Sequence, residues 1–111
     1  MCMLQENLSG ATRVLKAMAN ESRLHIMCEL AHGEKCVGDL EKIIGLSQSA
    51  LSQHLARLRK EQLVTTRRDA QTIYYSLLDG ALSPVLIALG DCFGAISESM
   101  RHMHETLQKQ A

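Results

Sequence analysis

The chain has 111 residues and a mass of 12.3 kDa, the size of a single domain with little room for a second. Apolar residues make up 46% and charged residues 22%, a globular composition that excludes an intrinsically disordered chain. No apolar run approaches the roughly 18 residues of a membrane span, and the first residues lack the pattern of a secretion signal. We therefore expect a cytoplasmic protein with no membrane partner.

The formal net charge is zero, but the charges are unevenly distributed. Residues 42–75 carry six basic and two acidic residues, a balance of +4, and the remaining residues carry −4. A positive face on an otherwise acidic body is what a phosphate-binding surface needs.

Four helices are predicted in the first part of the chain, over about residues 3–18, 21–31, 37–44 and 48–60. Asn20 is a suitable cap for the second helix, and Ser47 for the fourth. Gly45 is expected to end the third helix, because glycine adopts the left-handed conformation found after many helix ends. The helices over 37–44 and 48–60, joined by this short connection, predict a helix-turn-helix over residues 37–60.

The last of these helices has one apolar and one polar side. Leu51, Leu55 and Leu58 are expected to face the core, so small polar and amide side chains are left pointing outward. Such side chains reach base edges in the major groove, where Gln pairs bidentately with adenine. The DNA-contacting residues expected here are Ser47, Gln48, Ser49, Ser52, Gln53, His54 and Arg57. An ordinary solvated helix face is the alternative.

Two segments rich in β-forming residues follow, over 63–67 and 72–77. A two-stranded hairpin directly after a helix-turn-helix is typical of a winged helix, here with its wing over residues 63–77. Arg67, Arg68 and Gln71 are expected at the tip, against the phosphate backbone or the minor groove. The alternative is a structural hairpin with a solvated tip.

The last helix is expected to begin at Ser83 and Pro84. It carries an apolar seam with a period of 3.5 residues, made of Leu86, Leu89, Phe93, Ile96, Met100, Met103 and Leu107. A domain this small has little surface to cover so long a stripe, so a second copy is the expected partner. We predict one mainly α domain over residues 1–111, a winged helix-turn-helix with a small β-hairpin, which forms a homodimer through residues 1–19 and 79–109. Two-fold symmetry suits a palindromic operator in double-stranded DNA.

The segments 15–24, 37–40 and 46–59, together with the wing, resemble the ArsR/SmtB family of bacterial repressors over roughly residues 11–95. The resemblance implies a dimeric winged helix that occupies operator DNA until a metal, a metalloid or a sulfur species releases it. It implies a regulator and not an enzyme.

The inducer depends on which ligands this chain keeps. The family's As(III) sites use a Cys-x-Cys before Asp-Leu, but here Cys36 has Gly38 in place of its partner. The family's zinc and nickel pattern on the last helix is kept at only two of its four positions. We therefore expect no bound metal or cofactor. As(III) or metal sensing through Cys36 with Cys2, or through His102 and His104, stays open as an alternative.

Cys28 and Cys92 stand where the sulfur-sensing group of the family (the HlyU/BigR/SqrR group) carries two thiols that report oxidants or reactive sulfur by forming a disulfide or polysulfide link. His25 lies one helical turn before Cys28, and as imidazolium it would lower the pKa of the thiol and favour the nucleophilic thiolate. Gly90 and Gly94 flank Cys92, either softening the helix or allowing close packing. Two alternatives remain: Cys28 as an ordinary small core residue, and a thiol enzyme using Cys28 with His25, which lacks an oxyanion loop and paired carboxylates.

Overall fold

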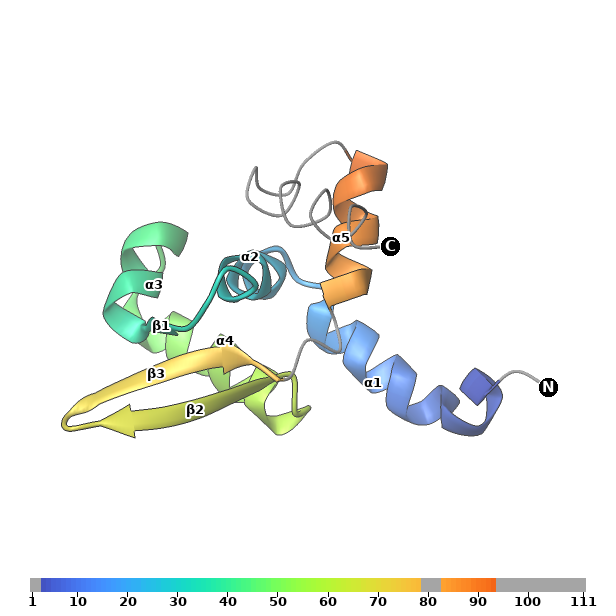
Figure 1. The fold of residues 1–111 in the computed structure, drawn as a ribbon, viewed down its shortest axis with the longest axis horizontal. Coiled ribbons are helices and arrows are strands. Elements are labelled where there is room, and N and C mark those ends of the chain that lie inside the picture. Colours follow the sequence, from blue (N-terminus) through green and yellow to red (C-terminus); the bar gives the residue numbers. More distant parts are fainter. Residues whose placement is uncertain (1–2, 79–82, 94–111) are drawn as a thin grey trace, which may run out of the picture.

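The computed structural model describes residues 3–78 and 83–93. The elements in chain order are η1 (Met3–Asn7), α1 (Leu8–Met18), α2 (Glu21–Leu30), β1 (Lys35–Cys36), α3 (Val37–Ile44), α4 (Gln48–Lys60), β2 (Val64–Asp69), β3 (Thr72–Leu77) and α5 (Ser83–Phe93). The β2–β3 hairpin and α1 extend to opposite sides of the helical body (Figure 1). None of the helices in the described part of the chain has the length and apolar character needed to cross a membrane.

The predicted helix boundaries are confirmed at the positions where local chemistry sets them. The Asn20 side chain accepts a hydrogen bond of 3.0 Å from the backbone N–H of Arg23, and the Ser47 hydroxyl accepts one of 3.2 Å from that of Ala50. Gly45 ends α3 with φ +84°, a left-handed conformation that costs glycine little. The first predicted helix differs, because its N-terminal turn is the 3₁₀ segment η1.

The wing is larger than the predicted two-stranded hairpin. A third strand, β1, lies before α3, and the sheet order is β1-β3-β2 with all neighbours antiparallel. Lys35 pairs with Tyr75 and Cys36 with Tyr74. A two-residue strand is too short to show an alternating pattern in the sequence, which is why β1 was not predicted. Its pairing ties the hairpin to the segment that enters α3.

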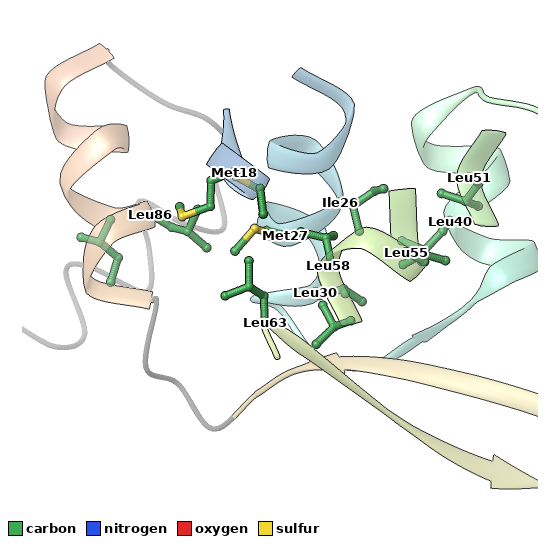
Figure 2. Packing of buried hydrophobic residues seen from close by; sticks show 14 residues of the cluster. Met18, Ile26, Met27, Leu30, Leu40, Leu51, Leu55, Leu58, Leu63 and Leu86 are labelled. Carbon is green, nitrogen blue, oxygen red and sulfur yellow. The ribbon is translucent and has the colours of Figure 1, made fainter. Parts of the chain in front are cut away.

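One apolar cluster holds the helices together (Figure 2). Its members come from α1, α2, α3, α4, the start of the wing and α5. The large labelled side chains are Met18, Ile26, Met27, Leu30, Leu40, Leu51, Leu55, Leu58, Leu63 and Leu86. The three α4 leucines are fully buried, as predicted, and their spacing of four and three residues places them on one helix face. This burial fixes the rotation of α4 and leaves its opposite face in solvent.

The last helix is described only as far as Phe93. Leu86 is fully buried in the core, so the first turns of α5 belong to the domain body. The rest of the predicted seam, from Ile96 to Leu107, lies outside the described residues, as does Gly94.

Candidate nucleic-acid interface

The solvent face of α4 is a continuous row of exposed side chains. Gln48, Ser49, Ser52 and Gln53 are exposed in its N-terminal half, and Arg57 follows one turn after Gln53. Residues three and four apart on a helix share a face, so these side chains form one stripe opposite the buried leucines. The stripe is neutral and polar at the helix N-terminus and basic toward the C-terminus. We call it the α4 face.

His54 differs from the other residues expected to contact DNA. It is half-buried, and its Nδ1 lies 3.5 Å from a guanidinium nitrogen of Arg23 on α2. The same guanidinium donates to the backbone carbonyls of Ala17 and Lys16 at the end of α1. Burial lowers the pKa of Arg23, and the nearby charge of Arg57 adds to this effect. Arg23 therefore connects the end of α1 to the middle of α4, a link that the sequence did not reveal.

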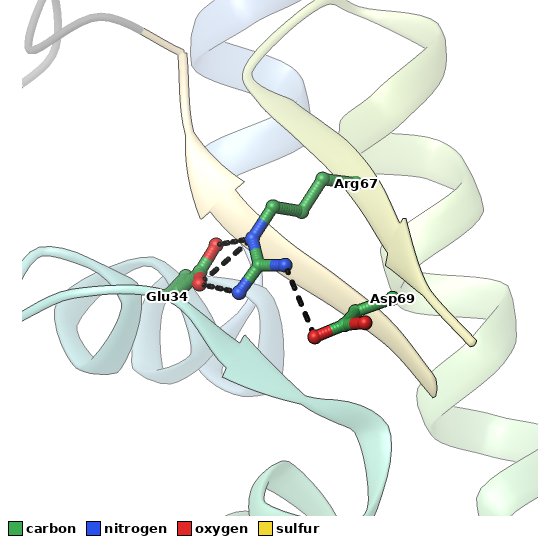
Figure 3. A network of polar contacts seen from close by, with 3 residues as sticks. All are labelled: Glu34, Arg67 and Asp69. Carbon is green, nitrogen blue, oxygen red and sulfur yellow. Dashed lines mark hydrogen bonds and ion pairs between the residues drawn. The ribbon is translucent and has the colours of Figure 1, made fainter. Parts of the chain in front are cut away.

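The three residues expected at the wing tip have different surroundings. Gln71 is exposed in the turn between β2 and β3. Arg68 is also exposed and lies opposite Ile73, in the second residue pair from this turn. Arg67 lies further from the turn, and its guanidinium is held by the Glu34 carboxylate (Figure 3). The hydrogen bonds from Arg67 lower the pKa of Glu34, and Glu34 in turn raises the pKa of Arg67. Glu34 lies outside the basic segment, so sequence reasoning did not connect it with the wing.

The basic charge of residues 42–75 is therefore partly compensated. Arg67 is paired with Glu34, and the acidic Glu61 lies 3.5 Å from Arg13 of α1. Within the described ranges, the basic residues of this segment without a carboxylate partner are Lys42, Arg57, Arg59, Lys60 and Arg68. Three of the five lie in the last two turns of α4, next to the polar part of the α4 face, so the positive potential is concentrated beside it.

The cysteines have contrasting environments. Cys28 is fully buried, Cys36 is half-buried and Cys92 is exposed, and all three are free thiols. Burial raises the pKa of Cys28 to about 11, and the charge of Glu29 contributes in the same direction. His25 lies 3.6 Å from a Glu29 carboxylate oxygen and so has an acidic partner on the same helix. The expectation that His25 lowers the pKa of the Cys28 thiol is therefore wrong.

Of the four residues proposed as metal ligands, Cys36 lies in the described part of the chain. No group of three or more His, Cys, Asp or Glu side chains in residues 3–78 and 83–93 is placed to hold a metal ion. Cys2, His102 and His104 lie outside these ranges. At Gly90, a Cβ atom would meet no atom of the described residues within 4 Å, so close packing against that part of the chain does not explain this glycine.

Large apolar side chains are exposed on the two helices expected to form the dimer. Leu8 and Leu15 of α1 are 54% and 58% exposed, and Phe93 of α5 is 79% exposed.

Residues 20–66, which contain the helix-turn-helix and the first residues of the wing, match the sequence model described as bacterial regulatory protein, arsR family. Over 89 residues the chain is also 53% identical to the nodulation protein NolR of Rhizobium meliloti, covering 80% of this chain and 73% of NolR. The chain belongs to the ArsR family.

Two solved structures resemble this ArsR-family protein over most of its length. Reduced HlyU from Vibrio cholerae superposes with a TM-score of 0.75 at 46% identity, over 81% of this chain and 95% of the HlyU chain. HlyU is described as a transcriptional activator. A homodimeric winged helix-turn-helix DNA-binding domain from Mycobacterium bovis gives a TM-score of 0.71 at 28% identity, over 85% of this chain and 87% of that one. The ArsR-family chain is thus a winged-helix transcription regulator that binds DNA, and not an enzyme.

Proposed function

We propose that the chain is a dimeric regulator that binds palindromic operator DNA through the α4 face and the wing. The observation that carries the proposal is the α4 face itself: exposed amide and hydroxyl side chains opposite three fully buried leucines, with basic residues in the adjoining turns. A rigid helix with this distribution brings hydrogen-bonding groups to base edges and positive charge to phosphates.

The dimer is supported by exposed apolar surface. Leu8, Leu15 and Phe93 expose more than half of their surface in a single protomer, and a second copy would cover them. The homodimeric state of the Mycobacterium bovis domain supports the same arrangement. Two copies of α4 related by two-fold symmetry would read two half-sites of a palindrome about one helical turn apart.

Within the α4 face, Ser52 and Gln53 are proposed as the first base-contacting residues, followed by Ser49 and Gln48. Backbone contacts are assigned to groups at the edge of this surface. They are Ser47, His54, Arg57, Arg68 and Gln71; Arg67 is left out of this group because its guanidinium is held by Glu34.

Gln53→Ala tests the base-reading role. Operator duplexes are first selected by the wild-type protein from a randomised pool about 30 base pairs long, which spans two half-sites. If Gln53 reads a base, its replacement relaxes discrimination at one position of each half-site by about 1–3 kcal/mol. Gln62→Ala is the matched control, because Gln62 is an exposed glutamine beyond the C-terminal end of α4. An equal loss of affinity on all sequences would make Gln53 a backbone contact instead.

The proposed signal is oxidation or sulfur linkage of Cys28 and Cys92. Exposure and pKa set the order of the steps: the exposed Cys92 reacts first, because the buried Cys28 has a raised pKa and little thiolate. The Cys92 thiolate attacks a sulfur atom of a polysulfide, which leaves as a shorter chain, and Cys92 becomes a persulfide. The Cys28 thiolate then attacks the inner sulfur of that persulfide and expels hydrosulfide, which joins the two cysteines.

Intact-mass analysis of the wild type, Cys28→Ser and Cys92→Ser after polysulfide exposure tests this order. Cys28→Ser should accumulate the persulfide on Cys92, and Cys92→Ser should leave Cys28 unmodified. DNA titrations of the reduced and polysulfide-treated wild type then test control, and an unchanged affinity would reject it. Adding As(III) or Zn(II) in the same mass experiment tests metal sensing, the alternative signal.

A further inference from the structure

Arg67 reaches across the whole three-stranded sheet. It pairs with Tyr74 on β3, and Tyr74 pairs in turn with Cys36 on β1. Side chains of directly opposed residues lie on the same face of a sheet. The Arg67 guanidinium lies over the Tyr74 ring, 4.4 Å from its centre, and ends at Glu34, the residue directly before β1. Figure 3 shows the guanidinium between the carboxylates of Glu34 and Asp69.

The Nε and Nη2 edge of the Arg67 guanidinium is engaged by Glu34. Its Nε lies 2.9 Å from each carboxylate oxygen of Glu34, and Nη2 lies 2.5 Å from Oε1. The remaining nitrogen, Nη1, lies 3.9 Å from Asp69 Oδ2. One cation thus faces two carboxylates, so the local charge is negative. A phosphate at the Nε and Nη2 edge would have to displace Glu34, and one at Nη1 would approach beside the Asp69 carboxylate, against this charge.

We propose that Arg67 is a positioning residue, which braces the wing against the segment entering α3, and that Arg68 is the wing cation that meets the DNA backbone. The proposal rests on the DNA-binding function proposed above. β1 contributes only two residues to the ladder, so the backbone pairing between the hairpin and the body is short. The Arg67–Glu34 pair adds a bidentate side-chain link beside it, of a kind that fixes orientation as well as distance. Arg68 is one residue nearer the turn, exposed, and without a carboxylate partner among the residues described.

A second possible role for Glu34, in which it only occupies Arg67 until DNA binds, makes a different prediction. If Glu34 were a stand-in for phosphate that releases Arg67 to the DNA, removing its charge would free the arginine and tighten binding. If the pair is a brace, removing either partner loosens the wing and weakens binding. Arg67→Lys separates the two further, because lysine keeps a positive charge for phosphate but cannot reproduce the planar fork.

The test measures binding of the selected operator duplex by wild type, Glu34→Gln, Arg67→Lys, the double variant and Arg68→Gln at several salt concentrations. Glu34→Gln and Arg67→Lys are each expected to weaken binding roughly five- to tenfold, within the range of couplings between distinct sites. Their salt dependence should stay that of the wild type, and the double variant should be no weaker than either single one. Arg68→Gln should reduce the salt slope by about 1.8, because each dimer would lose two phosphate contacts. Wild-type affinity for Arg67→Lys, or tighter binding by Glu34→Gln, would overturn the proposal.

Nuclear magnetic resonance of the Arg67 Nε–H group provides a readout in the wild type. The brace predicts a sharp, exchange-protected signal in the free protein that persists when the duplex is added and is lost in Glu34→Gln. A signal that disappears or shifts to a phosphate-bound position on DNA addition would overturn the proposal. If the wild type selects no duplex at all, the DNA-binding proposal fails. The Nε–H signal of the free protein still decides whether the brace exists.

Discussion

Alkylation of single cysteines tests the contrast between the two proposed sensor thiols. One variant keeps only Cys28 and a second keeps only Cys92, with serine at the other cysteine positions. Iodoacetamide reacts with the thiolate, so its rate depends on the ionised fraction and on access to the sulfur. We expect the Cys92 variant to be alkylated rapidly and the Cys28 variant to be nearly inert in the folded state.

The raised pKa of Cys28 sets a minimum for how much more slowly it is alkylated than an ordinary thiol. At pH 8, a thiol with the ordinary pKa of 9.0 is about 10% ionised, whereas Cys28, with a pKa of about 11, is about 0.1% ionised. Ionisation alone therefore slows Cys28 about a hundredfold relative to an unperturbed thiol. Cys28 is also fully buried, so the reagent needs a local opening of the core, which slows the reaction further.

Intact-mass spectra at successive times give both rates, and the same variants in denaturing urea provide the control. In urea the two cysteines should react at similar rates, because the burial that raises the pKa of Cys28 is gone. If the native Cys28 variant reacts as fast as the native Cys92 variant, the buried, weakly ionised thiol described here is wrong. The proposed order of the sulfur reaction would be wrong with it.

Three further predictions concern stability. Because folding raises the pKa of Cys28, the contribution of this thiol to the free energy of unfolding is fully present below pH 9 and is lost as the pH rises toward about 11, with a limit of about 3 kcal/mol. In urea unfolding measured at several pH values, Cys28→Ala should reduce the fall in stability between about pH 9 and about pH 11, and an unchanged fall would contradict this prediction. Ser47→Ala should cost about 1 kcal/mol in urea unfolding through the lost N-cap of α4, whereas a neutral result would mean that the cap bond contributes nothing. Arg23→Gln should cost about 2 kcal/mol, because the Ala17 carbonyl loses a charged donor and His54 loses its neighbour; wild-type stability of this variant would exclude Arg23 as a structural link.

The helix-turn-helix was predictable because its determinants are local. The cap at Ser47, the left-handed Gly45 and the leucine spacing of α4 each act within one or two helical turns. The rotation of α4, and with it the exposed position of Gln53, follows from that spacing. Most of the candidate interface could therefore be read from a short stretch of chain.

The contacts of His54 and Arg67 could not be predicted from the local sequence. Both are polar residues in the segment expected to contact DNA, and no local pattern separates them from Gln53 or Arg68. Their partners, Arg23 and Glu34, are 31 and 33 residues away along the chain. Only the packing of α2 on α4, and of β1 on β3, brings these pairs together.

The amino-acid sequence by itself determined the helices, the hairpin, the apolar face of α4 and the membership of the ArsR family, because hydrophobic period and capping chemistry are written in neighbouring residues. Tertiary structure decided the protonation of Cys28, the third strand and the engagement of Arg67. These depend on desolvation and on charges supplied by distant segments, and sequence spacing carries no measure of either.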